Sequence, residues 1–216
     1  MSSSHRAFFK KVTRQAISYF QIRTADCEKQ DPIDVNVYAK GFGNVAGHAR
    51  YGAIEVFAES GMPVPAYVPE RYIRGERAQL LFHEWYHVLQ ITLSPAPPPP
   101  TWFMEGSAEW AGFEAAVRFG YFDSMDFVRE VLRYDARRPP ATLSKAKPEN
   151  PGVYSLYFTS VDFLVKKYGG KDRLRLFWQR YNPGDSWKAT FRSVFKTKVD
   201  TFLKKFEAHR EAGFTD

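Results

Sequence analysis

The sequence contains one cysteine, Cys27, among its 216 residues. A disulfide bond requires two cysteines, so this count excludes an internal disulfide framework and any zinc site built from cysteine thiolates. Cys27 follows Ala25 and Asp26 at the end of a predicted helix, where a small packing residue is its simplest role. Any metal site in the chain is therefore expected to use other side chains.

Long hydrophobic runs are also absent. The longest uninterrupted apolar run falls far short of the roughly 20 residues that a membrane-spanning helix needs, so no transmembrane segment is expected. The N-terminal segment lacks the apolar centre of a secretory signal peptide. These absences favour a cytoplasmic protein if the N-terminus is native, and a secreted protein is the alternative if a leader has been removed. The compartment stays unknown from the sequence.

Acidic residues are scarce between residues 166 and 210, which contain 13 Lys and Arg but only four Asp and Glu. The formal net charge is +9 in this segment and +7 for the chain, which leaves −2 for the remainder. A basic segment favours acidic substrates, nucleic acid or a membrane surface. Because motifs that combine aromatic and basic residues for nucleic-acid binding are absent, no nucleic-acid partner is expected, and a solvated helical face is the simpler interpretation.

Residues 80–90 (LLFHEWYHVLQ) contain neither glycine nor proline and are largely apolar, which predicts a buried helix. Positions four apart on a helix lie one above the other, so His83 and His87 direct their imidazoles into the same space. That separation suits one tetrahedral zinc ion. Glu84 lies one step round the helix, where it can take a proton from a metal-bound water. Two packed core histidines are the alternative.

Residues 102–110 (WFMEGSAEW) form a second predicted helix and place Glu105 18 positions after His87. Two histidines and one carboxylate make the three-ligand set of a catalytic zinc site, which leaves one position open. The sequence therefore predicts Zn2+ as the cofactor. Glu109 lies one turn after Glu105 and is the candidate acceptor for the second ring nitrogen of His83. An exposed helix glutamate is the alternative for Glu109.

The pattern His-Glu-x-x-His followed by Trp-aromatic-x-Glu-Gly-x-Ala-Glu resembles the gluzincins, the zinc peptidases whose third ligand is a glutamate on the following helix. More narrowly, it is similar to the compact peptidase MA-like members, some of which are called minigluzincins. The resemblance extends from about residue 33 to about residue 206 and is sharpest at the two metal motifs. It implies that His83, His87 and Glu105 bind zinc and that Glu84 is the general base and acid.

The resemblance also implies two further roles. A tyrosine or histidine of the C-terminal lobe often stabilises the oxyanion in this family, and a phenol suits that role because it donates a hydrogen bond to developing charge. Tyr154 matches the family pattern best and Tyr157 is the reserve; core packing is the alternative for both. Residues 51–58 resemble the strand that borders the cleft and pairs with an extended substrate. An ordinary internal strand is the alternative there.

The predicted fold is a single zincin-like domain of class α+β over residues 1–216. A small N-terminal mixed β-sheet with the active-site helix occupies residues 1–94, and a helical C-terminal lobe occupies residues 95–216. Alternation predicts strands at 34–39 and 51–58, and the active-site helix is expected to start near residue 74. The proline-rich run Ser94–Thr101 is predicted to be a stiff spacer between the two metal helices.

The sequence therefore predicts a zinc-dependent peptidase that acts on a peptide or protein substrate. Because no aminopeptidase motif is visible, an endopeptidase is favoured. Residues 137–152 contain four prolines and are expected to form a mobile rim of the cleft. One alternative is a latent or non-catalytic binding or regulatory module on the same scaffold. Another is a polyanion-binding protein whose zinc site is incidental. Substrate preference and oligomeric state do not follow from the sequence.

Overall fold

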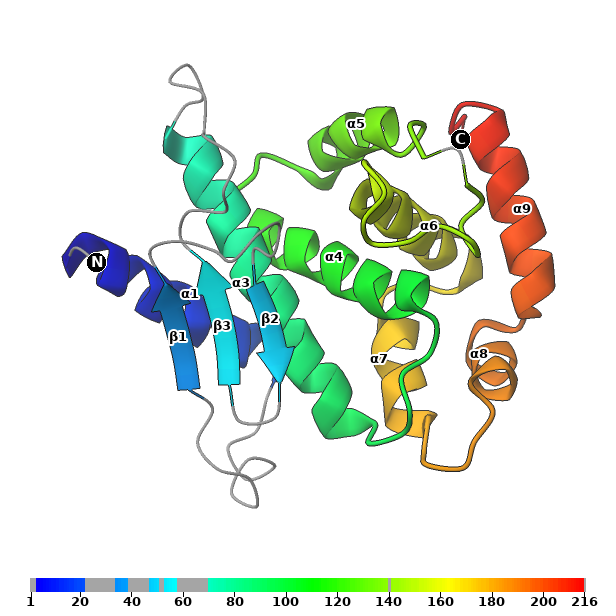
Figure 1. The fold of residues 1–216 in the computed structure, drawn as a ribbon, viewed down its shortest axis with the longest axis horizontal. Helices are drawn as coiled ribbons and strands as arrows, with labels where there is room; N and C mark the ends of the chain where they lie inside the picture. Colours follow the sequence, from blue (N-terminus) through cyan, green and yellow to red (C-terminus); the bar gives the residue numbers. More distant parts are fainter. Residues whose placement is uncertain are drawn as a thin grey trace. The chain divides into compact units, whose positions relative to one another are not determined.

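The computed structural model describes residues 3–21, 34–38, 47–50, 53–57, 70–139 and 141–215. Helices dominate this part of the chain (Figure 1). They are α1 (Ser3–Phe20), α3 (Glu70–Leu93), α4 (Thr101–Arg118), α5 (Met125–Asp135), α6 (Val153–Tyr168), α7 (Asp172–Arg180), α8 (Trp187–Phe195) and α9 (Val199–Glu211). The strands are β1 (Asp34–Tyr38), β2 (Gly47–Arg50) and β3 (Ala53–Phe57). Cys27 lies outside the described residues.

The predicted α+β class is wrong because the structure is predominantly helical, and the N-terminal mixed β-sheet is limited to three short strands. Each described strand has only four or five residues, whereas the helices α1 and α3 in the same N-terminal part have 18 and 24. Alternating segments at 34–39 and 51–58 suggested a larger β contribution than these short strands make. A helix satisfies its own backbone hydrogen bonds, so α3 fills the interior without needing a sheet partner.

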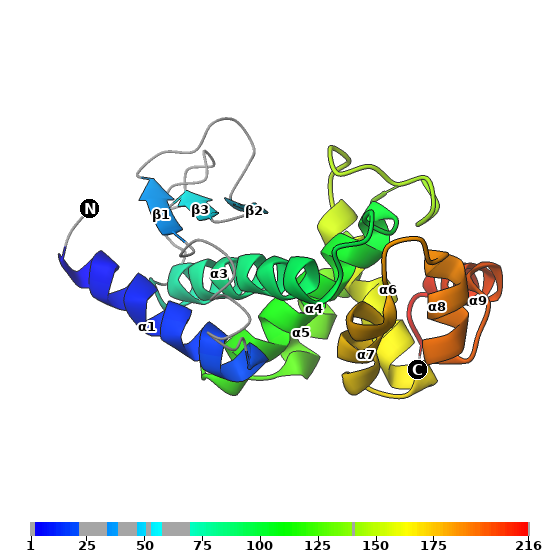
Figure 2. The same cartoon turned by 90° about the horizontal axis from the view of Figure 1, so that it is seen from below.

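The chain divides into two compact units, and the first comprises Met1–Thr92 and Ala111–Met125. Its centre is α3, in which twelve residues are buried. Residues 81–86 are buried without interruption, so the middle of α3 is enclosed on all sides. Helix α1 packs on α3 through Phe20, whose ring lies 6.5 Å from that of Phe82 and 5.5 Å from that of Tyr86. Figure 2 shows the three strands on one side of α1 and α3.

The boundary of the first unit differs from the lobe boundary expected after residue 94. The segment after Trp110 belongs to the first unit because Phe119 stacks on Phe82 at 5.7 Å and Tyr121 donates a hydrogen bond to Gln15. Helix α3 also begins at Glu70, four residues before the expected start.

The three strands pair in the order β1-β3-β2. Strand β1 runs parallel to β3 with Asp34 opposite Ala53, and β2 runs antiparallel to β3 with Arg50 opposite the same Ala53. Residues 53–57 therefore form the central strand, whose backbone is already paired on both sides. The expectation that this strand pairs with an extended substrate is wrong, because its hydrogen-bonding groups are used inside the sheet.

The second unit comprises Leu93–Trp110 and Asp126–Asp216 and has an aromatic core. Phe103 of α4 lies at its centre, with ring centroids 4.7 Å from Phe177 and 5.7 Å from Phe191. Edge-to-face and offset contacts of this kind stabilise a core beyond the area they bury. Further members of the cluster are Trp178, Phe195, Phe202 and Phe206.

Helices α4 and α6 approach closely within the second unit at Gly106. A Cβ atom at this position would lie 2.6 Å from the carbonyl oxygen of Tyr157 and 2.9 Å from a methyl group of Val161. Glycine is therefore required because any side chain would collide with the backbone of α6. A glycine in the middle of a helix indicates that another segment approaches closely, and here that segment is α6.

The prolines after α3 are held by one tyrosine of the second unit. Tyr181 donates a hydrogen bond from its hydroxyl to Pro97 O at 2.8 Å, and Ser94 donates to Tyr181 O at 2.6 Å. The connection to α4 is thus fixed both by its proline backbone and by these two bonds. Among the described residues, no helix combines the length and apolar character that a membrane crossing requires.

Candidate metal site

His83 and His87 lie one turn apart on α3 and point their rings at one another. The two Nε2 atoms are 2.9 Å apart, and the ring centroids are 4.6 Å apart with an angle of 81° between the ring planes. His83 is only 4% exposed. The predicted convergence of the two imidazoles is therefore present, and it follows from the four-residue spacing on a regular helix.

Gln90 determines which nitrogen of His87 faces His83. Its Oε1 lies 2.7 Å from His87 Nδ1, and an amide oxygen only accepts hydrogen bonds, so Nδ1 carries the proton. In the neutral ring Nε2 then holds a lone pair. The 2.9 Å contact between the rings is consequently a hydrogen bond donated by His83 Nε2 to His87 Nε2. A metal ion at this point would replace that shared proton.

Glu105 completes the group. One ligand atom from each of His83, His87 and Glu105 lies within 4.8 Å of the others. The close packing of α4 at Gly112 is consistent with this arrangement, because a Cβ there would lie 3.0 Å from Gln79 O and 3.1 Å from His83 N. Glu105 stands seven residues, or about two helical turns, before Gly112 and so lies on the same face of α4.

Glu84 follows His83 directly and is 2% exposed. A carboxylate so deep in a helix is unusual, because charged side chains are seldom fully buried without a specific role or partner. Glu84 sits on the most enclosed part of α3, where Leu81 and Phe82 are 0% exposed. Its position beside a metal-ligand candidate gives a physical reason for a carboxylate at this point.

The two tyrosines predicted for the oxyanion have different surroundings. Tyr157 is fully buried, and its hydroxyl donates a hydrogen bond to Ala146 O at 2.9 Å. Burial, followed by the negative charges of Glu105 and Glu149, raises the pKa of Tyr157 to about 12. Tyr154 is 41% exposed, and its ring lies 5.9 Å from that of Tyr157. The hydroxyl proton of Tyr157 is thus already used in a hydrogen bond to the backbone oxygen of Ala146.

Two residues that shape the candidate metal site, Gln90 and Gly112, were not predicted from the sequence. Gln90 stands three positions after His87, so the i, i+3 rule for helix neighbours contained the signal. Gly112 gave only a weak signal, since a glycine in mid-helix costs stability and suggests a close approach. Glu109 is half-buried, and its predicted hydrogen bond to His83 stays a prediction.

The donor set fits a zinc ion. Two histidine nitrogens bound to one tetrahedral zinc lie about 3.3 Å apart, only a few tenths of an ångström from the Nε2 separation seen here. Two imidazoles and one carboxylate would leave one position of the ion open, whereas structural zinc takes four protein ligands. The described residues contain this one group of three with the required proximity.

No family model matches the chain, and no curated protein or solved structure matches it. The resemblance to the gluzincins therefore rests on the residues alone and stays a prediction.

Proposed function

We propose that the chain is a zinc-dependent peptidase of the gluzincin type. The observation that carries this proposal is the convergence of His83, His87 and Glu105 within 4.8 Å, next to the buried Glu84. A pair of core histidines would have no need of a carboxylate ligand from a separate helix. Gln90 also holds His87 with Nε2 toward His83, which is the orientation that a shared metal ion requires.

His83 and His87 would hold the zinc through Nε2, and Glu105 would hold it through a carboxylate oxygen. When bound, the ion supplies Lewis acidity, which lowers the pKa of a water molecule and polarises the carbonyl of the substrate. The buried position of His83 keeps bulk water from competing for the ligands. Gln90 keeps His87 in the tautomer that binds metal through Nε2.

Glu84 acts on protons in the proposed reaction. Its carboxylate takes the proton from the attacking water, which adds to the substrate carbonyl carbon. The same carboxyl group then gives that proton to the amine as the carbon–nitrogen bond breaks. Because Glu84 ends as the carboxylate in which it began, the proton balance closes in one turnover.

Tyr154 is the better candidate for stabilising the oxyanion, and this assignment is part of the proposal. Its phenol is partly exposed, whereas the proton of Tyr157 is directed to Ala146 O. We expect Tyr154→Phe to lower kcat by about tenfold to a hundredfold, because it removes one donor to developing charge. Tyr157→Phe should leave kcat within a few-fold of wild type. A larger loss in kcat from Tyr157→Phe than from Tyr154→Phe would reverse the assignment.

The central experiment replaces Glu84 with glutamine, which keeps the shape of the side chain but cannot accept the proton. Glu84→Gln should retain bound zinc and lose peptide cleavage by about 10²- to 10⁴-fold. Metal content by mass spectrometry and cleavage of a peptide library measure the two properties. Glu114→Gln, at a half-buried position on α4, is the matched control.

The outcome separates the proposed enzyme from a binding module. Full peptide cleavage by zinc-loaded Glu84→Gln would show that another group is the base. Absence of cleavage by zinc-loaded wild type, across the library, would favour a latent or non-catalytic module on the same scaffold.

A further inference from the structure

Helix α5 presents apolar side chains to solvent. Val131 is 41% exposed and Tyr134 is 67% exposed, which makes them two of the three exposed large hydrophobic residues in the described part of the chain. Residues three or four positions apart lie on one face of a helix, so the half-buried Phe127 extends the same line by one turn. We call Phe127, Val131 and Tyr134 the α5 stripe. Single exposed apolar residues are ordinary, whereas an aligned group of them is typical of a contact surface.

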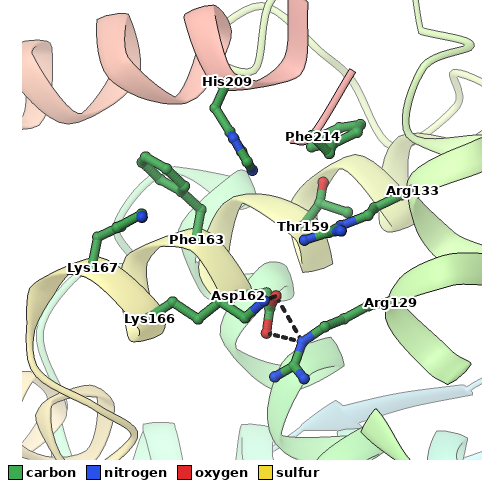
Figure 3. Close-up of a pocket in the computed structure, with 9 residues that line it drawn as sticks. All are labelled: Arg129, Arg133, Thr159, Asp162, Phe163, Lys166, Lys167, His209 and Phe214. Atoms are coloured by element: carbon green, nitrogen blue, oxygen red, sulfur yellow. Dashed lines mark hydrogen bonds and ion pairs between the residues drawn. The ribbon is translucent and has the colours of Figure 1, made fainter. Parts of the chain in front are cut away.

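The opposite side of α5 is used inside the second unit. Arg129 points toward α6 and donates from Nε to both oxygens of the buried Asp162 at 3.0 Å (Figure 3). Val131 stands two residues after Arg129, about 200° round the helix, so it faces away from α6. The cavity around Asp162, of about 230 Å³, is bordered by four cationic side chains, Arg129, Arg133, Lys166 and Lys167.

Several charges beside the α5 stripe interact with neighbours in the same chain. Arg129 also donates from Nη1 to Asp126 Oδ1 at 2.7 Å, and Arg138 Nε lies 3.2 Å from Asp135 Oδ1. The guanidinium carbon of Arg138 lies 5.5 Å from the centroid of the Tyr134 ring. The charges of Asp126 and Arg138 are therefore satisfied largely within one chain.

Glu130 and Arg137 differ from these neighbours, and their charges have opposite signs. Glu130 is exposed, lies next to Val131 and one turn before Tyr134, and forms no ion pair with any described residue. Arg137 is also exposed and donates to the backbone oxygen of Gly213 at 2.9 Å, which is a neutral acceptor. The α5 stripe is thus bordered by an uncompensated negative charge along its length and by a positive charge beyond its C-terminal end.

We propose that the α5 stripe is the contact surface of a homodimer in which the α5 helices of two copies pack antiparallel about a twofold axis. A twofold axis brings the same surface of both copies together, so the apolar stripe of each copy covers that of the other. In the antiparallel arrangement Glu130 of each copy faces Arg137 of the other, and this pair forms twice. A parallel arrangement would place Glu130 against Glu130, which like-charge repulsion disfavours.

The charge pattern favours a second copy over a membrane or a nucleic acid. Glu130 borders the stripe and would repel anionic headgroups and phosphates. An unrelated protein would have to supply both complementary charges, whereas this chain carries both beside one stripe. Because a stripe of about three turns buries less area than a permanent dimer needs, the association is expected to be weak and to depend on concentration.

Sedimentation equilibrium of the full chain measures the association. The apparent mass should be close to that of one chain at about 10 µM and should rise toward that of two chains at about 1 mM. Tyr134→Ser should weaken the association about tenfold or more, because aromatic residues at the centre of an interface contribute much of its binding energy.

Charge reversal tests the antiparallel geometry. Glu130→Arg alone and Arg137→Glu alone should each stay largely monomeric at the concentration at which wild type associates, since each places like charges together. An equal mixture of the two variants should regain the association of wild type, because each copy then meets a charge of the opposite sign. Asp200→Arg, at an exposed acidic position on α9, is the matched control and should associate as wild type does.

Each remaining result would contradict part of the proposal. Wild type that stays monomeric at about 1 mM would overturn the homodimer. A mixture of the two charge variants that stays monomeric, although wild type associates, would overturn the antiparallel pairing. Binding of a monomeric wild type to vesicles of phosphatidylserine and phosphatidylcholine would assign the stripe to a membrane surface instead. Circular dichroism of each variant verifies the fold, and recovery in the mixture shows that neither variant is misfolded.

Discussion

His87 carries a different interaction on each ring nitrogen. Nδ1 donates to Gln90 Oε1 at 2.7 Å, and Nε2 faces His83 Nε2 at 2.9 Å. The first bond fixes both the tautomer and the rotation of the ring. Gln90 is 3% exposed, so water cannot easily replace it as the acceptor. The orientation of His87 therefore depends on a residue that is not itself a candidate metal ligand.

Replacing Gln90 tests this dependence. Gln90→Leu removes the acceptor while keeping an apolar side chain of similar size, so we expect zinc affinity to fall about 10- to 100-fold. Gln90→Glu retains an acceptor for Nδ1–H and should stay close to wild type. Competition with a chromophoric chelator measures both affinities. If Gln90→Leu binds zinc as tightly as wild type, the orienting role is refuted.

The side chains of the candidate metal site differ in how far the sequence could predict them. His83, Glu84 and His87 follow from helical spacing alone, because they lie within two turns of one helix. Glu105 needed the additional pattern on the next helix. The hydrogen bond from Tyr157 to Ala146 O was not predictable, since it joins α6 to a loop whose path depends on packing elsewhere.

The loop between α5 and α6 is a longer segment whose contacts also could not be predicted from the sequence. Its four prolines suggested a mobile rim, but α9 holds it in several places. Glu207 accepts a hydrogen bond from Leu143 N at 2.6 Å, and Arg210 donates to Ala141 O at 3.0 Å and also to Pro139 O. Leu143 is 1% exposed. These bonds from α9 satisfy part of the loop backbone, and the mobility of the segment stays a prediction.

The crossing of α4 and α6 gives a prediction about stability. Gly106→Ala would place a methyl group 2.6 Å from Tyr157 O, so the helices must separate or the backbone must distort. We expect the free energy of unfolding to fall by about 1–3 kcal/mol, the usual effect of overpacking. Chemical denaturation measures the change.

Arg118→Ala, at an exposed position on the same helix, is the control for the general effect of alanine in α4. It should change the free energy of unfolding by less than about 0.5 kcal/mol. A loss from Gly106→Ala no larger than this would show that α4 and α6 accommodate the methyl group freely.

Helix positions were predictable where apolar residues recur every three or four positions, as in α1 and α6. The fold class was not, because the length of a strand and the number of its partners depend on contacts between distant segments. Strand β2 was not among the predicted strands, which lay at 34–39 and 51–58. The sheet order that places β3 in the centre likewise depends on residues far apart in the chain.

Alkaline pH should destabilise the whole chain through its buried phenols. Burial is the main cause that raises the pKa of Tyr72, Tyr121, Tyr157 and Tyr181, and the pKa of Tyr157 reaches about 12. Unfolded tyrosine ionises near pH 10.0, so between that value and about 12 the unfolded state releases protons that the folded state keeps. The stabilisation is complete below pH 10 and is lost as pH rises through about 12.

The contribution of one phenol can be isolated. In Tyr157→Phe the fall in unfolding free energy between about pH 9 and about pH 11 should be smaller than in wild type, since one raised pKa is gone. Urea unfolding at the two pH values measures this. Tyr134→Phe, at a side chain that is 67% exposed, is the control and should reproduce the wild-type difference. Identical pH dependence in all three proteins would contradict the assignment.

Charge is distributed unevenly over the molecule. The segment from 166 to 210, with its formal charge of +9, belongs to the second unit and supplies two of the four cations around Asp162. The sequence favoured a solvated face for these residues. Most of these cations are exposed, as that interpretation predicts, and Lys166 and Lys167 also border a cavity to which α5 contributes Arg129 and Arg133.

The run between α3 and α4 has a consequence for self-digestion. Five of the six residues from 95 to 100 are proline, and proline has no amide hydrogen to donate to a neighbouring strand. A peptidase that binds its substrate in extended form through backbone hydrogen bonds would therefore bind this stretch weakly. The exposed Pro97 and Pro98 would therefore be poor targets for other copies of the same molecule, although they lie beside the proposed catalytic helix.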